Sequence, residues 1–354
     1  MQIRMLLKIW HEANYMKAAL KRYSGSLACG KYHQHNSFHA FSLDEPETRA
    51  KACLYFDKSN AWKRIVSVTS FLNRIGYYSN KNKRSTGEYE GFYVANNYDK
   101  VRETKLFSFK NKKILTICTS SSEAEKQIEQ YRALGSAYNM PRVERSDKYE
   151  NAFEISMIDL KVVDHDILAL KNICSSTIAN NPVINDLHTV RVQDVIAFSF
   201  DEEMDSYMKK IADQIDPSIR DMQIPFCVQH GDLSKENLIY GECEGKTDFW
   251  WIDWEHMKER VFFYDYFFYI LNSALYEDFG PFACYIHDDS NEMLASFFAH
   301  FGLAFDASKK LDYFLVYAID FLKERVCLKS GLPMVERYYN LIEAMKRYAK
   351  GEKK

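Results

Sequence analysis

The sequence has no closely spaced cysteine pair. Its eight cysteines lie scattered along 354 residues without a C-x-x-C motif. Disulfide frameworks and structural zinc sites depend on such spacing, so the scatter argues against both. We interpret the cysteines as reduced thiols, most of them buried as small apolar side chains.

A secretory leader and a membrane-spanning run are also missing. Lys8, His11 and Glu12 interrupt the apolar core that a signal peptide at the start of the chain would need. The apolar stretch 261–275 contains Asp265 and is shorter than the ~20 residues that span a bilayer. We therefore expect a cytoplasmic protein without a transmembrane segment.

Charge of one sign is not in excess, because 47 basic and 49 acidic residues leave a formal net charge of -2. No overall field directs the chain to nucleic acid or an anionic membrane, so we expect no nucleic-acid partner, and any basic site must be local. Internal repeats are missing as well. What the sequence has is 47% hydrophobic and 15% aromatic residues, enough for a large core in two domains or lobes.

The N-terminal segment, residues 1–90, is an extension to which we assign no role. It contains a strand-like piece at 52–56 and apolar residues at helical spacing over 61–75. The polar, glycine-containing stretch 80–91 predicts a loop that ends it.

A strand-rich segment, residues 91–159, follows. The runs 104–109 and 113–118 flank a short polar turn and predict an antiparallel hairpin. Ser122, with Glu125 three residues later, is typical of a capping box that opens a helix over 123–134. A further strand is predicted at 152–158.

Residues 160–354 read as mostly helical. Apolar periodicity predicts helices in the stretches 167–173, 190–198, 204–215, 262–275 and 311–348. The chain is thus predicted to be an α+β protein with two lobes, strand-rich at the N-terminal side and helical at the C-terminal side.

Two polar motifs interrupt apolar runs in the second half of the chain: HGDLSKENLIY at 230–240 and FWWIDWEHM at 249–257. Short strands around them would put Asp232 and Asn237 on one loop and Asp253 at the end of an antiparallel partner, across a turn over 241–248. Carboxylate and amide oxygens are ligands that Mg²⁺ prefers, and a carboxylate beside the metal can take a proton from a hydroxyl.

The pattern H-G-D-L-x-x-x-N followed by I-D-W-E resembles the aminoglycoside phosphotransferase and choline kinase group, small-molecule kinases with the protein-kinase-like fold. The resemblance extends to Asp265 in FFYDYFFYI. It implies Asp232 as the catalytic base and Asn237 and Asp253 as Mg²⁺ ligands. It also implies supporting roles for the residues His230, Glu255 and Asp265.

The resemblance is weaker in the strand-rich lobe, where the nucleotide would bind. A lysine should end the strand over 113–118, yet Cys118 stands there. Lys113, or Lys112 beside it, is then the candidate for the phosphates, with Glu129 or Glu125 as the ion-pair partner. The backbone near Met157 and Asp159 would hold adenine. No G-x-G-x-x-G motif precedes the hairpin.

These patterns predict an ATP- and Mg²⁺-dependent phosphotransferase that acts on a hydroxyl of a small molecule or a cell-envelope sugar. Two alternatives stay open. One is a pseudokinase-like nucleotide-binding or scaffolding module without phosphotransfer. The other is a choline/ethanolamine-type kinase, for which Trp250, Trp251 and Trp254 would supply aromatic faces, or an aminoglycoside-type kinase. Peripheral membrane contact is expected only if the acceptor is lipid-linked.

Overall fold

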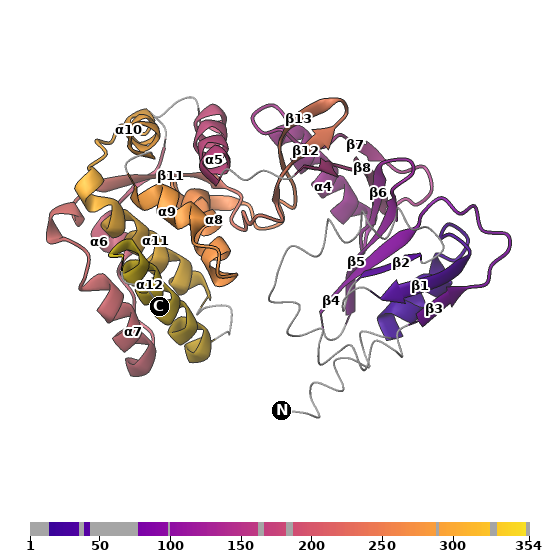
Figure 1. Ribbon diagram of the computed structural model, residues 1–354, viewed down its shortest axis with the longest axis horizontal. Helices are drawn as coiled ribbons and strands as arrows, with labels where there is room; N and C mark the ends of the chain where they lie inside the picture. Colours follow the sequence, from indigo (N-terminus) through magenta and orange to yellow (C-terminus); the bar gives the residue numbers. More distant parts are fainter. Residues whose placement is uncertain are drawn as a thin grey trace. The chain divides into compact units, whose positions relative to one another are not determined.

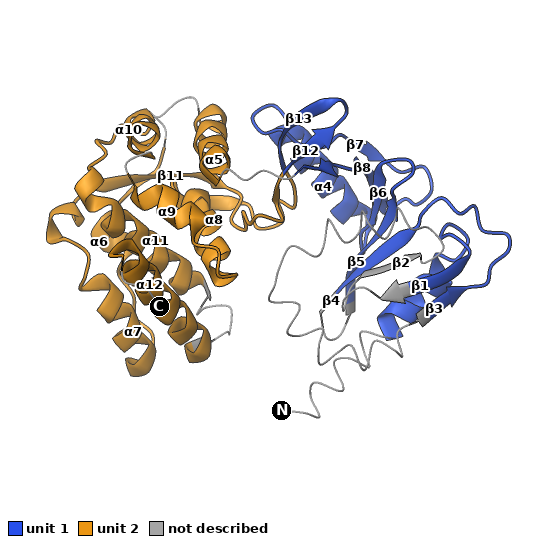
Figure 2. Cartoon of the chain, viewed as in Figure 1, with its two compact units in different colours: residues 1–162, 240–250 blue, residues 163–239, 251–354 orange. Residues whose placement is uncertain are grey.

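The computed structural model describes residues 14–34, 39–42, 77–97, 100–161, 166–181, 187–287, 290–325 and 331–351 (Figure 1). The predicted strand at 52–56 and the helical run at 61–75 lie outside these residues. The chain divides into two compact units. Unit 1 comprises Met1–Val162 and Tyr240–Trp250, and unit 2 comprises Val163–Ile239 and Trp251–Lys354 (Figure 2).

Unit 1 is built on an eight-stranded sheet with the order β3-β1-β2-β4-β5-β6-β8-β7. All neighbouring strands pair antiparallel. The strands are β1 (Gly30–Gln34), β2 (His39–Ser42), β3 (Tyr77–Asn80), β4 (Gly91–Asn97), β5 (Lys100–Ser108), β6 (Lys113–Ile117), β7 (Val143–Arg145) and β8 (Ala152–Ser156). The predicted hairpin is confirmed as β5 and β6. Because β2 pairs with β4, the described part of the N-terminal segment extends the same sheet rather than forming a separate layer.

The two faces of β6 have different neighbours because side chains alternate along a strand. Leu115 and Ile117 pack in a core that includes buried residues of the helix over 14–22. On the other face, Cys118 packs against Ala124 and Ile128 of α4 (Ser121–Leu134). The helix over 14–22 therefore covers one face of the sheet, and α4 covers the other.

Helix α4 has the apolar stripe that the sequence predicts, with Ala124, Ile128, Tyr131 and Leu134 buried. Its N-cap differs from the prediction. Ser120, two residues before Ser122, accepts the hydrogen bond from the N–H of Glu123 at 3.2 Å. Glu123 in turn accepts from the N–H of Thr119, so the cap forms two residues earlier in the chain than expected.

Unit 2 is mostly helical, as predicted. Its helices are α5 (Asp166–Asn180), α6 (Val192–Val195), α7 (Glu202–Ala212), α8 (Tyr264–Leu275), α9 (Gly280–Ile286), α10 (Asn291–His300), α11 (Lys310–Arg325) and α12 (Gly331–Ala349). A small sheet joins β10 (Thr189–Arg191), β11 (Gln223–Gln229) and β14 (Lys258–Val261) in that order. The helix predicted over 190–198 is wrong: strand β10 pairs with β11 there, and only one turn of helix follows.

A third sheet has the order β13-β12-β9 and contains β9 (Asp159–Leu160), β12 (Leu238–Cys243) and β13 (Lys246–Trp251). The turn between β12 and β13 is only Glu244 and Gly245, both with positive φ (53° and 81°), which matches the two-residue hairpin turn that suits strand twist. The predicted turn over 241–248 was too wide. The tight turn sets the register that brings the end of β13 back beside the start of β12.

The N-cap of α4 can be tested because Ser120 caps the helix in the structure, whereas the sequence predicted Ser122. Ser120→Ala should destabilise the first turn of α4 by about 1 kcal/mol, since it leaves the N–H of Glu123 without its acceptor. Ser122→Ala is the matched control and should cost much less. Amide hydrogen exchange in α4 is the measurement, because a chain of two units need not unfold in one step. A larger effect from Ser122→Ala would contradict the cap.

Candidate functional site

The loop over 230–237 is anchored by Asp265, the second residue of α8. The N–H groups of His230 and Gly231 donate to its two carboxylate oxygens at 2.6 and 2.8 Å. Asp265 is 1% exposed. Burial raises its pKa to about 6, against the hydrogen bonds from Gly231 and His230, which lower it. The carboxylate is therefore ionised at neutral pH and can accept from both N–H groups.

The imidazole of His230 is buried beneath the loop in one tautomer. Its Nε2 lies 2.8 Å from the carbonyl oxygen of Ile252, and its Nδ1 lies 3.3 Å from the N–H of Asp232. Since a carbonyl only accepts and an N–H only donates, Nε2 carries the proton and Nδ1 accepts. Burial lowers the pKa of His230 to about 4, although the Ile252 carbonyl and Asp253 raise it. His230 thus contacts the loop and Ile252 as a neutral ring, and the supporting role that the resemblance implies for it stays a prediction.

Gly231 occupies a position that only glycine fits. Its φ is +83°, and a Cβ there would lie 2.5 Å from the carbonyl oxygen of His256 and 2.9 Å from the guanidinium of Arg260. Arg260 is buried, stacks on Tyr264 and pairs with Glu324 of α11. Arg260 was missed by sequence reasoning, because its partner lies more than sixty residues away.

Asn237 connects the loop to the end of β13. Its side-chain Nδ2 donates to the backbone carbonyl oxygen of Asp232 at 2.8 Å. The backbone carbonyl oxygen of Asn237 accepts from the N–H of Ile252 at 3.0 Å. With Nδ2 committed to Asp232, the side-chain oxygen Oδ1 is the atom through which Asn237 could bind a cation. Asp253 follows Ile252 directly, so the backbone of the three predicted residues is brought together within unit 2.

Asp253 has a φ of 66°, in the left-handed region that non-glycine residues rarely adopt. Such a conformation persists where the surroundings enforce it, and it is frequent at functional sites. Asp253 is exposed, and Glu255 is exposed beside His256. An amide oxygen and a carboxylate form a hard oxygen donor set, so Asn237 and Asp253 fit Mg²⁺ in chemistry.

Lys235, inside the same loop, contacts one carboxylate of α5 and one of the α8–α9 connection. Its ammonium lies 2.9 Å from Asp166 and 2.6 Å from Asp278, and 5.8 Å from the centre of the Tyr269 ring. Burial lowers its pKa, but the pull of Tyr269 and the two carboxylates outweighs this and raises it. Lys235 therefore holds the loop to α5 and to the α8–α9 connection. The sequence offered only a lysine within the motif as a signal.

The three tryptophans are buried and do not form an exposed aromatic box. Trp250 donates to the carbonyl of Gly241 and Trp251 to the side chain of Asn172, both at 3.0 Å. Trp254 lies with its ring 4.6 Å from that of His230. All three are at most 6% exposed, so they do not offer faces to a quaternary ammonium. Trp251 and Trp254 instead pack against the ring of His230.

The predicted nucleotide residues lie in unit 1 and are not all brought together. Lys113 pairs with Glu154 at 2.7 Å, whereas Glu129 is exposed on α4. Asp159 pairs with Lys112, and the N–H of Met157 donates to the carbonyl of Lys112 at 2.8 Å. The assignment of these residues to a nucleotide stays a prediction.

The face of β6 that contacts α4 has no lysine. Ile114, Thr116 and Cys118 share this face by alternation. Thr116 is 1% exposed, and its hydroxyl has no hydrogen-bond partner. Cys118 occupies the position at which the resemblance implies a phosphate-binding lysine, and Ile114 and Thr116 on the same face are uncharged as well.

Among the described residues, no group of three or more His, Cys, Asp and Glu side chains gathers as a metal site. No helix in the described ranges is long and apolar enough to cross a membrane.

No protein-family profile and no curated protein matches the chain. Solved structures similar to it include an aminoglycoside 2'-phosphotransferase in its GDP complex, with 12% identity over 82% of this chain and 99% of that chain, at a TM-score of 0.43. An aminoglycoside phosphotransferase from Streptomyces rimosus has 16% identity over 62% and 89%, at 0.34. A choline/ethanolamine kinase family protein from Mesorhizobium loti has 11% identity over 73% and 94%, at 0.35. These are the groups of proteins that the two motifs resemble.

The buried state of His230 predicts an unusual titration. The unfolded chain takes up this proton at about pH 6.5 and the folded chain only at about pH 4. The folded state therefore loses stability as the pH falls through that window. In a ¹⁵N-histidine NMR spectrum at pH 5, the signal that disappears in His230→Gln should belong to a neutral ring protonated at Nε2. A His230 signal that titrates near pH 6.5 would contradict the buried geometry.

The Lys235 contacts predict a coupling between charges. Lys235→Met should lower the free energy of unfolding of unit 2 by about 1 kcal/mol, because Asp166 and Asp278 then face each other without a cation and are only partly screened. In the double variant Lys235→Met/Asp278→Asn, part of the loss should return, since one of the two like charges is gone. Urea titrations of the four forms measure the coupling. Strictly additive effects would show that Lys235 does not hold the two carboxylates together.

Proposed function

We propose that this chain is a nucleotide-dependent phosphotransferase that transfers a phosphoryl group from ATP to a hydroxyl of a small molecule or a cell-envelope sugar. The observation that carries the proposal is the hydrogen-bonded frame in unit 2. Asp265 fixes the start of the loop, and Asn237 and His230 both bind the backbone of Ile252. This frame supports Asp232, Asn237 and Asp253 as one site.

Asp232 is proposed as the base that orients the acceptor hydroxyl and takes its proton. Its N–H donates to His230, and its carbonyl accepts from Asn237 and from the N–H of Ser234. With the backbone held at both ends, the half-buried carboxylate needs little reorganisation when the acceptor binds. Orientation and proton transfer are the chemistry that this residue can supply.

Asn237 and Asp253 are proposed as the residues that hold Mg²⁺. The ion, when bound, neutralises charge on the phosphates of the nucleotide. Asn237 contributes an oxygen whose amide is already oriented by its bond to Asp232. Asp253 contributes a carboxylate at a backbone position that the end of β13 enforces. Glu255, two residues later and exposed, is proposed to assist the metal or the acceptor.

Adenine is proposed to bind backbone groups of residues 157–159, with Lys113 and Glu129 near the phosphates. Since the N–H of Met157 already donates to Lys112, the purine would use other backbone groups of this segment. The pairing of Lys113 with Glu154 means that Lys113 must leave that carboxylate to contact a phosphate.

A second candidate is a module that binds a nucleotide without transferring a phosphoryl group. The absence of a lysine from the α4-facing side of β6, among Ile114, Thr116 and Cys118, favours it. In this case the loop of unit 2 would hold Mg²⁺ and nucleotide, and the chain would act through what it contacts rather than by catalysis.

Two variants and one control test the proposed metal ligand and the proposed base. Asp253→Ala should abolish the Mg²⁺-dependent thermal stabilisation by ATP. Asp232→Asn should keep that stabilisation but reduce ADP formation with a panel of sugars and amino alcohols by about 10²- to 10⁴-fold, the usual contribution of a general base. Asp221→Asn is the matched control, because Asp221 is exposed in unit 2 outside the loop.

Each outcome has a clear meaning. Stabilisation by Mg²⁺-ATP without ADP from any acceptor favours the non-catalytic module. Unchanged ADP formation in Asp232→Asn would remove Asp232 as the base. Stabilisation that survives Asp253→Ala would remove Asp253 from the metal site.

A further inference from the structure

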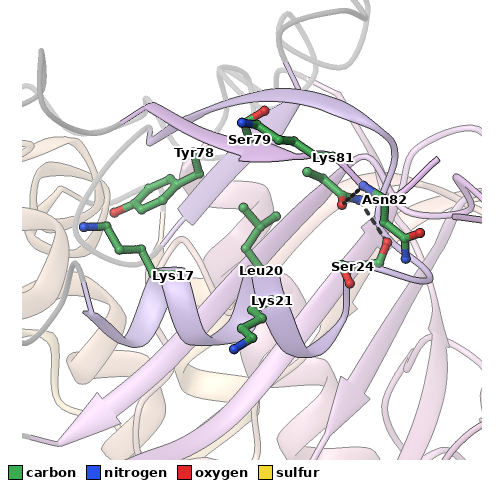
Figure 3. A pocket seen from close by; sticks show the side chains of 9 residues that line it. Lys17, Leu20, Lys21, Ser24, Tyr78, Ser79, Lys81 and Asn82 are labelled. Carbon is green, nitrogen blue, oxygen red and sulfur yellow. Dashed lines mark hydrogen bonds between the residues drawn. The ribbon is translucent and has the colours of Figure 1, made fainter. Parts of the chain in front are cut away.

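Unit 1 contains a pocket that none of the predicted nucleotide or catalytic residues lines. It has a volume of about 460 Å³ and lies between the helix over 14–22 and the end of β3 (Figure 3). Three lysines line it: Lys17, Lys21 and Lys81. Its other polar side chains include Ser24, Ser79 and Asn82, and no Asp or Glu is among the described residues that line it.

The two described segments that form the pocket carry charge of one sign. Segments 14–31 and 77–87 contain seven Lys and Arg residues and no Asp or Glu, in a chain whose charges otherwise nearly cancel. Hydrogen bonds hold the two segments together: Asn80 donates to the carbonyls of Ser24 and Leu27 at 2.9 and 2.6 Å, and Thr86 donates to Gly25 at 2.9 Å. The positive charge is therefore concentrated by the fold, although the two segments are far apart in the sequence.

The floor of the pocket is buried and ordered by these contacts. Leu20, Tyr78 and Asn80 are 7%, 5% and 3% exposed. Burial raises the pKa of Tyr78 to about 12, so its hydroxyl stays protonated at neutral pH. In Figure 3 this hydroxyl lies beside the ammonium of Lys17 at one end of the pocket. Three cations around a built floor are complementary to an anion.

The lysines also repel one another. Lys17 and Lys21 are four residues apart on one helix face, a spacing at which like charges are destabilising. Lys81 adds a third positive charge from the strand side. A bound anion with more than one negative charge would relieve this repulsion and could accept hydrogen bonds from Ser24, Ser79 or Asn82.

We propose that this pocket binds the phosphate group of a ligand. The ligand's source is either a soluble phosphorylated molecule or a lipid headgroup, since both carry the same recognised group. The site does not depend on the proposed function, because it shares no residue with the loop of unit 2 or with the segment proposed to hold adenine.

The test is a titration with inorganic phosphate at constant ionic strength, followed by NMR shifts or calorimetry. Replacing Lys17, Lys21 or Lys81 by Gln should weaken phosphate binding roughly fivefold each, which corresponds to losing one charge contact in water. Lys83→Gln is the matched control. It removes the same charge two residues from Lys81, but Lys83 does not line the pocket.

Asp253→Ala separates this site from the proposed nucleotide site. Phosphate binding that persists in Asp253→Ala but weakens in Lys81→Gln supports the pocket. No phosphate binding, or an equal loss in Lys83→Gln and Lys81→Gln, would overturn the proposal, because the second result describes diffuse attraction rather than a site. All of these lysines are exposed, and far-UV circular dichroism would verify that each variant is folded.

A sedimentation arm identifies the source of the phosphate. Vesicles of phosphatidylcholine with phosphatidic acid should bind the chain in a way that depends on Lys17, Lys21 and Lys81 if the ligand is a headgroup. If soluble phosphate binds and these vesicles do not, the ligand is a soluble molecule. If neither binds, the pocket does not recognise phosphate.

Discussion

The carboxylate of Asp265 is the contact on which the candidate site depends. It is buried at the start of α8, it is held there by an aromatic helix, and its two oxygens take the N–H groups of His230 and Gly231. A buried carboxylate is costly unless it is hydrogen-bonded, so the loop and the carboxylate stabilise each other. Without this carboxylate, the N–H of Gly231 would lose the acceptor that holds the residue at its positive φ.

A chain of short contacts connects Asp265 to the other residues of the site. Gly231 lets the chain pass close to Arg260 and His256, and the neutral ring of His230 reaches the carbonyl of Ile252. Asn237 then takes the N–H of the same residue. The tight hairpin between β12 and β13 brings the second motif back to the first, although fifteen residues of sequence lie between Asn237 and Asp253.

In unit 1 the strands agree with the prediction, but the position of the lysines does not. Its central strands follow the order expected of the predicted hairpin, helix and further strand, yet the face of β6 toward α4 holds Ile114, Thr116 and Cys118. The charge that would be expected there is found elsewhere in the unit, around the pocket formed by the helix over 14–22 and β3. Three lysines of this unit thus line a pocket beside β3, whereas none lies on the side of β6 that faces α4.

Features that depend on neighbours along the chain could be predicted before the fold was known. The periodicity of α4, the hairpin of β5 and β6, the strands around HGDLSKENLIY and the glycine at position 231 could all be predicted, because local spacing and backbone freedom decide them. Tertiary structure alone decided the partners of Lys235, Arg260 and Lys113, and the cap at Ser120 in place of Ser122. Ion pairs join side chains that folding brings together from distant segments, and no local pattern identifies which carboxylate a lysine will meet. The shift of the cap has a similar cause, since the end of β6 and the packing of α4 against Phe153 set where the helix begins.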